Sequence, residues 1–134
     1  MHIKSLGARL IALAMVVVIG LMGCSSSTTG LTGEYRQDTL TVVESLKNVI
    51  ELPLDDPAQR EAQTLAREQM NDYVSRYRRN DKFGGLRSFT TMQTASNSLA
   101  GFYSSYGNRP VPEKLKKRLQ QEFKQVELSL KRGL

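Results

Sequence analysis

The sequence is short of the side chains on which most enzyme chemistry depends. Its 134 residues include no tryptophan, one histidine (His2) and one cysteine (Cys24). A single cysteine cannot form an internal disulfide, and His2 lies in an N-terminal segment that we expect to be removed. A general base for neutral pH, a free catalytic thiol and the usual zinc ligands are therefore missing. These absences argue against an enzyme, and we expect neither a metal nor a cofactor.

The longest uncharged apolar run is too short to span a bilayer. It covers residues 10–22 and follows Lys4 and Arg9, whereas a spanning helix needs about 20 apolar residues. A positive start before a run of this length is typical of a secretory signal peptide. The run ends at Cys24 in the sequence LMGC. This pattern resembles the bacterial lipobox, in which the cysteine thiol receives diacylglycerol and the chain is cleaved before it. The alternative is an uncleaved anchor, or an ordinary signal with a chance cysteine.

Three segments follow from this interpretation. Residues 1–23 are a lipoprotein signal peptide that is removed, residues 24–33 a lipidated flexible tether, and residues 34–134 one folded domain. The 111 residues that remain after cleavage are enough for a single modest core. Cleavage also lowers the number of Lys and Arg from 19 to 17 against 13 Asp and Glu, so the formal net charge falls from +6 to +4.

Four amphipathic helices are predicted in the folded domain. Apolar residues recur every three or four positions, and no stretch sustains the period of two that marks a strand. The predicted helices run over residues 35–51, from Pro57 to Arg79, from Ser88 to Tyr106, and from Pro110 to a stop at Gly133. Asp56 is the predicted N-cap of the second helix and Ser88 that of the third.

Short connections between these helices favour antiparallel neighbours. We therefore predict an all-α fold, an antiparallel up-down-up-down four-helix bundle. Its core is expected to contain the apolar stripe of each helix. The stripes comprise Val43, Leu46 and Ile50, with Val42 and Val49 beside them; Ala62, Leu65, Ala66, Met70, Tyr73, Val74 and Tyr77; Phe89, Met92, Leu99, Tyr103 and Tyr106; and Leu115, Leu119, Phe123, Val126 and Leu130.

Two clusters of basic residues are candidate binding surfaces. Arginine and aromatic residues are enriched at the centres of protein interfaces, and the first cluster interleaves both types around the connection between the second and third helices. Its members, our predicted partner-binding residues, are Arg76, Arg78, Arg79, Lys82, Phe83 and Arg87. The second cluster is Lys114, Lys116, Lys117 and Arg118, for which docking and simple solubility are equally good explanations. Export behind a lipid anchor argues against nucleic acid as the partner of either cluster.

Six stretches, in order along the chain, carry a family resemblance. They are LTG at 31–33, QDTLTV at 37–42, DYVSRYRR at 72–79, SFTTMQT at 88–94, SLAGFY at 98–103 and RPVPEKLKKRL at 109–119. Together they resemble the photosystem II assembly and repair lipoproteins of cyanobacteria, the Psb twenty-seven family. The similarity covers nearly the whole mature chain.

The resemblance implies a non-catalytic four-helix bundle, lipid-anchored on the luminal side of the thylakoid membrane. It implies transient binding to photosystem II intermediates, through luminal loops of the smaller chlorophyll-binding inner antenna subunit. It also implies action before or during assembly of the manganese-calcium oxygen-evolving cluster. The family pattern transfers no contact residues, so the choice of the basic cluster rests on its charge and its interleaved aromatic residues. We expect a monomer.

Two other functions are compatible with the residues. A structural envelope lipoprotein that binds lipid or cell wall would fractionate with the envelope instead of with thylakoids. A carboxylate-dependent hydrolase would require a residue such as Asp72 or Glu68. The ordinary spacing of these carboxylates is typical of solvated helix faces.

Overall fold

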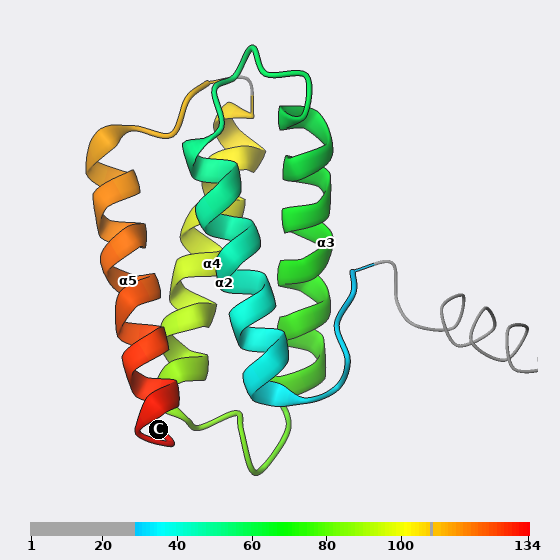
Figure 1. Ribbon diagram of the computed structural model, residues 1–134, viewed down its shortest axis with the longest axis vertical. Helices are drawn as coiled ribbons and strands as arrows, with labels where there is room; N and C mark the ends of the chain where they lie inside the picture. Colours follow the sequence, from blue (N-terminus) through cyan, green and yellow to red (C-terminus); the bar gives the residue numbers. More distant parts are fainter. Residues whose placement is uncertain (1–28, 108) are drawn as a thin grey trace, which may run out of the picture. The chain divides into compact units, whose positions relative to one another are not determined.

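A computed structural model of the chain describes residues 29–107 and 109–134, and the predicted signal peptide and Cys24 lie outside these ranges. Four helices follow one another: α2 (Tyr35–Glu51), α3 (Gln59–Tyr77), α4 (Arg87–Tyr106) and α5 (Glu113–Lys131) (Figure 1). No strand occurs in the described residues, so the predicted all-α class is confirmed. No helix in the described part of the chain is long and apolar enough to cross a membrane.

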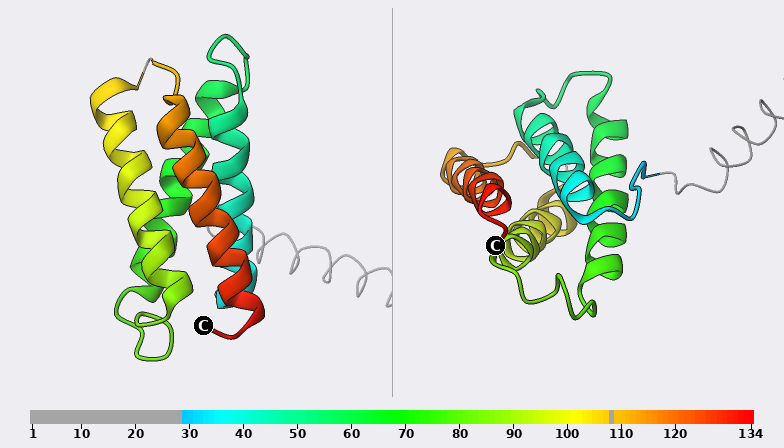
Figure 2. Two further views of the ribbon diagram at one scale, coloured as in Figure 1. Left: turned by 90° about the vertical axis from the view of Figure 1, so that its left-hand side faces the viewer. Right: turned by 60° about the horizontal axis from the view of Figure 1, so that its bottom comes forward.

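Residues Leu31–Leu134 form one compact unit in which each helix packs on two others. Helix α2 contacts α3 and α5, and α4 contacts the same two helices from the other side. Successive helices run in opposite directions, as the two further views also show (Figure 2). This is the predicted up-down-up-down bundle. Because the connections are short, consecutive helices pack antiparallel, and each apolar stripe is buried against its neighbours.

The core lies along the bundle axis and combines aliphatic and aromatic side chains. Helix α2 contributes mainly Val and Leu together with Tyr35, whereas the other three helices contribute the remaining large rings. The largest fully buried side chains include Tyr73, Phe89, Phe123, Leu46, Met92, Leu99 and Leu119. Apart from two positions, the predicted stripes supply this core or its half-buried margin.

Leu65 and Tyr106 were predicted to be buried but are 38% and 50% exposed. The buried stripe of α3 passes instead through Ala66, whose small side chain lies in the core position beside Leu65. Tyr106 is the last residue of α4, beyond the packed part of the bundle, where its ring contacts Phe102 at 5.6 Å between centroids.

Three predicted helix starts were also wrong. Helix α5 begins at Glu113 and not at Pro110, because Pro110–Pro112 precede the helix, with Pro112 in a non-helical conformation at its N-cap. Helix α3 begins at Gln59 because the residues before it form tight turns, with Asp56 donating to Pro53 and Gln59 to Asp56 through backbone hydrogen bonds of 3.1 and 3.0 Å. Helix α4 begins at Arg87, one residue before Ser88. Ser88 is completely buried, because its hydroxyl points into the bundle instead of capping the helix.

Candidate functional site

The predicted partner-binding residues surround a well-defined turn between α3 and α4. We call Arg76, Arg78, Arg79, Lys82, Phe83 and Arg87 the basic turn. The side chain of Asn80 accepts hydrogen bonds from the backbone N–H groups of Lys82 (2.8 Å) and Phe83 (3.3 Å), and its carbonyl accepts one from Gly84 (2.8 Å). These bonds fix the backbone conformation of the turn from which the charged side chains project.

Gly84 is required by the tight packing of this turn. A Cβ atom at position 84 would lie 2.6 Å from the carbonyl oxygen of Arg78 and 3.0 Å from that of Asn80. Backbone oxygens cannot move away as a flexible side chain could. The close return of the chain therefore depends on the absence of a side chain at this position.

Three arginines of the basic turn are exposed and available to a partner. Arg78 and Arg79 follow the end of α3, and Arg87 is the first residue of α4. Within the described residues, none of the three forms an ion pair. They present uncompensated positive charge around the turn, which is the electrostatic requirement for attracting an acidic partner.

The other two cations of the basic turn have contacts within the chain. Arg76 Nε donates to Asp72 Oδ1 at 2.8 Å, and this hydrogen bond raises the pKa of Arg76. Lys82 Nζ lies 5.4 Å from the centroid of the Phe83 ring. Arg76 is therefore partly compensated, and Lys82 lies over the aromatic residue of the turn.

Phe83 attaches the basic turn to the core. Its ring stacks on Tyr35, with centroids 4.5 Å apart and planes 7° apart, and it meets Tyr77 edge-on at 5.7 Å. Tyr73 and Tyr77 are buried, as predicted, and do not line the surface. Burial raises the pKa of both hydroxyls, so they remain protonated hydrogen-bonding groups.

A buried carboxylate beside the turn was missed by the sequence analysis. Asp38 of α2 is fully buried and accepts four hydrogen bonds. They come from the Thr32 N–H (2.7 Å) and hydroxyl (3.0 Å), the Gly33 N–H (2.9 Å) and the Tyr77 hydroxyl (2.6 Å). Asp38 thereby holds residues 31–33, which the sequence assigned to the tether, against α2 and α3. We call this arrangement the Asp38 clasp.

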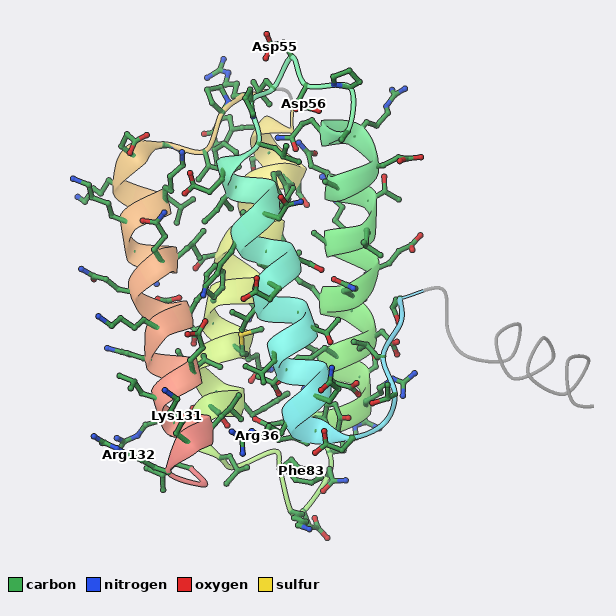
Figure 3. The ribbon with its side chains drawn as sticks, viewed as in Figure 1. Arg36, Asp55, Asp56, Phe83, Lys131 and Arg132 are labelled. Carbon is green, nitrogen blue, oxygen red and sulfur yellow. The ribbon has the colours of Figure 1, made fainter. Side chains whose placement is uncertain are left out.

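Additional cations that the sequence analysis did not select lie at the same end of the bundle. Figure 3 shows Arg36, Lys131 and Arg132 there, together with Phe83, while Asp55 and Asp56 lie at the opposite end. Arg36 is in the first turn of α2, and Lys131 and Arg132 close α5. Arg36 is far in the sequence from the adjacent Lys131 and Arg132, so no local cluster of charge could have brought the three together.

The second basic cluster, at the start of α5, is partly neutralised by neighbouring acids. Lys116 pairs with Glu113 at 3.7 Å, and Arg118 pairs with Glu122 at 3.0 Å. Both pairs follow the helical spacing of three or four residues, which is typical of a solvated helix face. This cluster therefore serves below as a control surface.

The described residues contain no group of three or more His, Cys, Asp or Glu placed to hold a metal. Of the two carboxylates considered for hydrolysis, Asp72 is paired with Arg76, and Glu68 is exposed on α3. The arrangement suits binding of a partner through charge and shape.

Comparison with known proteins gives consistent similarities. Residues 5–130 match the family model described as Photosystem II Pbs27. The chain is 61% identical over 132 residues to the photosystem II lipoprotein Psb27 of Synechocystis sp., covering 98% of each chain. It is 54% identical over 129 residues to the photosystem II assembly factor lipoprotein Psb27 of Thermosynechococcus vestitus, covering 96% of each. The solution structure of Psb27 from cyanobacterial photosystem II matches with a TM-score of 0.75 and 64% identity, over 82% of this chain and 96% of that one.

Proposed function

This chain belongs to the photosystem II Psb27 family, and from that membership we propose that it is a photosystem II assembly and repair factor. It binds assembly intermediates and is not itself an enzyme. Its relatives are named as lipoproteins of photosystem II, one of them explicitly as an assembly factor. The protein is accordingly associated with the thylakoid membrane.

The finer proposal concerns the place and consequence of binding. The bundle docks on the luminal side, at the luminal loops of the smaller chlorophyll-binding inner antenna subunit. From there it assists or controls assembly of the manganese-calcium oxygen-evolving cluster. Cys24 carries the lipid that keeps the protein at the membrane.

The observation that carries the docking proposal is the basic turn. Arg78, Arg79 and Arg87 are exposed and form no ion pair within the described residues, and the hydrogen bonds of Asn80 fix the backbone of the connection between Arg79 and Arg87. A preformed positive surface speeds the encounter with an acidic partner and selects its orientation. Little ordering of the turn is needed on binding, which favours affinity.

The test is charge reversal of the exposed arginines. The variant R78E/R79E/R87E should bind purified photosystem II intermediates at least about tenfold more weakly than wild type, and with a smaller dependence on salt. A matched control is K114E/K117E/K124E, which makes the same change in charge on exposed residues of α5. Affinity is measured by titration of intermediates prepared without the endogenous protein, at low and high ionic strength.

Equal affinity of the triple arginine variant and wild type would remove the basic turn as the interface. Fractionation with the envelope, independent of the antenna subunit, would instead support a structural envelope lipoprotein. Intact-mass analysis of the purified protein tests the lipid at Cys24 separately.

A further inference from the structure

An apolar cleft lies beside the basic turn, between parts of the chain that are distant in sequence. It has a volume of about 260 Å³ and draws its walls from the start of α2, the α3–α4 connection, the start of α4 and the end of the chain. Its lining residues are Tyr35, Arg36, Lys82, Phe83, Leu86, Ser88, Leu130, Gly133 and Leu134. The sequence analysis selected only Lys82 and Phe83 among them as binding residues.

Hydrogen bonds hold the walls of this cleft together. The Ser88 hydroxyl is 2.7 Å from the Tyr35 hydroxyl, and the Ser88 N–H donates to the Leu134 carbonyl at 3.1 Å. The Leu134 N–H in turn donates to Ser129 at 2.9 Å, and Gly133 has a φ of +72°, which allows the chain to fold back over α5. The cleft is therefore formed before any partner arrives.

The rim of the cleft is positively charged. Arg36 and Lys82 line it, and Lys131 and Arg132 adjoin the wall made by Leu130 and Gly133. Figure 3 shows Arg36, Lys131 and Arg132 gathered at this end of the bundle with Phe83. None of these four cations forms an ion pair within the described residues. An apolar floor inside a cationic rim suits an apolar group flanked by negative charge.

We propose that this cleft receives one aliphatic or aromatic side chain from an acidic segment of the photosystem II partner. The inference rests on the proposed function and extends its interface from the basic turn to residues 130–134. The inserted side chain packs against Phe83 and Leu134, and neighbouring carboxylates of the segment pair with the rim. Such a central apolar anchor with surrounding polar contacts is the usual arrangement of an interface hot spot.

The size of the cleft favours a protein segment over a lipid. Pockets that enclose small-molecule ligands typically measure about 300–1,000 Å³, and this cleft lies below that range. It suits one large side chain, whereas the acyl chains of a lipid would extend beyond its walls. Its continuity with the basic turn through Lys82 and Phe83 points to the same partner for both surfaces.

The experiment compares two leucines of similar exposure on the intact lipoprotein. Leu134 lines the cleft and is 42% exposed, while Leu128 faces outward from α5 and is 44% exposed. We expect L134D to weaken binding to purified photosystem II intermediates at least about tenfold, and L128D to leave it within about twofold. The variant R36E/K131E/R132E should weaken binding to a similar extent. Circular dichroism checks that each variant is folded. If L134D is not folded, the affinity of R36E/K131E/R132E tests whether the cleft belongs to the interface.

The outcomes separate this inference from the proposed function. If L134D and R36E/K131E/R132E bind like wild type while R78E/R79E/R87E does not, the cleft is not part of the interface and the proposed function stands. If wild type itself does not bind the intermediates, the proposed function fails first and the inference with it.

A photo-cross-linking residue at position 134 identifies the occupant. The expected product joins it to a partner segment with an apolar residue between Asp or Glu residues, and a product with a basic segment would overturn the proposal. Flotation of the C24S chain with phosphatidylglycerol vesicles tests the lipid alternative. Vesicle binding that L134D abolishes would assign the cleft to a lipid and also overturn it.

Discussion

The two ends of the bundle differ in how completely their buried polar groups are hydrogen-bonded. At the end that carries the basic turn, Asp38 accepts four hydrogen bonds, and the hydroxyls of Tyr35 and Tyr73 are bonded to Ser88 and Thr39. Toward the opposite end, Gln59 Oε1 and the Tyr103 hydroxyl are buried without a hydrogen-bond partner in the described residues. Burial raises the pKa of Tyr103 to about 12.

This difference indicates where the fold is most strongly specified. A fully bonded polar network fixes its surroundings in one arrangement, whereas a buried polar atom without a partner costs stability and specifies little. The satisfied network lies directly under the proposed interface. We infer that the end that carries the basic turn is the rigid end of the bundle, and the following predictions test that comparison in order of expected effect.

The largest effect is expected from Asp38. Replacing it by alanine should lower the free energy of unfolding by about 3 kcal/mol, because hydrogen bonds to a charged group are worth roughly 1.5–3 kcal/mol and Tyr77 loses a buried partner. The same substitution at exposed Asp55, at the other end, should cost less than about 0.5 kcal/mol. Chemical denaturation monitored by circular dichroism measures both. Similar losses for D38A and D55A would contradict the asymmetry.

An intermediate effect is expected from the turn glycines. G84A should destabilise the protein by about 2 kcal/mol, the usual size of an overpacking penalty, because the new Cβ meets the Arg78 carbonyl. G85A is the matched control, because nothing lies within 4 Å of its Cβ position, and its effect should be close to zero. Thermal unfolding compares the two variants. If G84A were as stable as G85A, the turn would be more adaptable than proposed.

The smallest effect compares one hydroxyl from each end. Y35F removes a 2.7 Å hydrogen bond and leaves the buried Ser88 hydroxyl unpaired, at a cost of about 1 kcal/mol. Y103F removes a hydroxyl that has no partner in the described residues, so stability should be unchanged or slightly higher. Denaturant titrations with wild type alongside resolve a difference of this size. Equal costs for the two variants would show that both ends are bonded alike.

Much of the fold could be predicted because it depends on local periodicity. The bounds of α2 agree with the sequence prediction at both ends, because its apolar stripe is regular and Pro53 follows it closely. The cations of the basic turn could be selected from the sequence because they lie close together in it, and their role in partner binding stays a prediction. Leu65 was misplaced because periodicity identifies a face but not which of two adjacent residues occupies its centre.

The rest depended on contacts between distant segments. Asp38 lies three residues after Tyr35 and four before Val42, so helical periodicity places it on the buried stripe. A carboxylate at a buried position needs hydrogen-bond partners, and this was the only feature of the sequence that could have indicated the clasp. Nothing local shows that Ser88 bonds to both Tyr35 and Leu134. The cleft is assembled from segments that are distant in the sequence, so finding it required the structure.

If Cys24 carries the proposed lipid, the Asp38 clasp also limits how far the bundle can lie from the membrane. Because Leu31 is buried and residues 32–33 are bonded to Asp38, only seven residue steps separate the body of the protein from Cys24. A fully extended chain gains about 3.5 Å per residue, so a lipid on Cys24 would confine the bundle to within roughly 25 Å of the bilayer. With such an anchor, this short connection would concentrate the protein on targets at the membrane surface. Opening the clasp would lengthen the connection by several residues, so one buried carboxylate would then set the reach of the whole molecule.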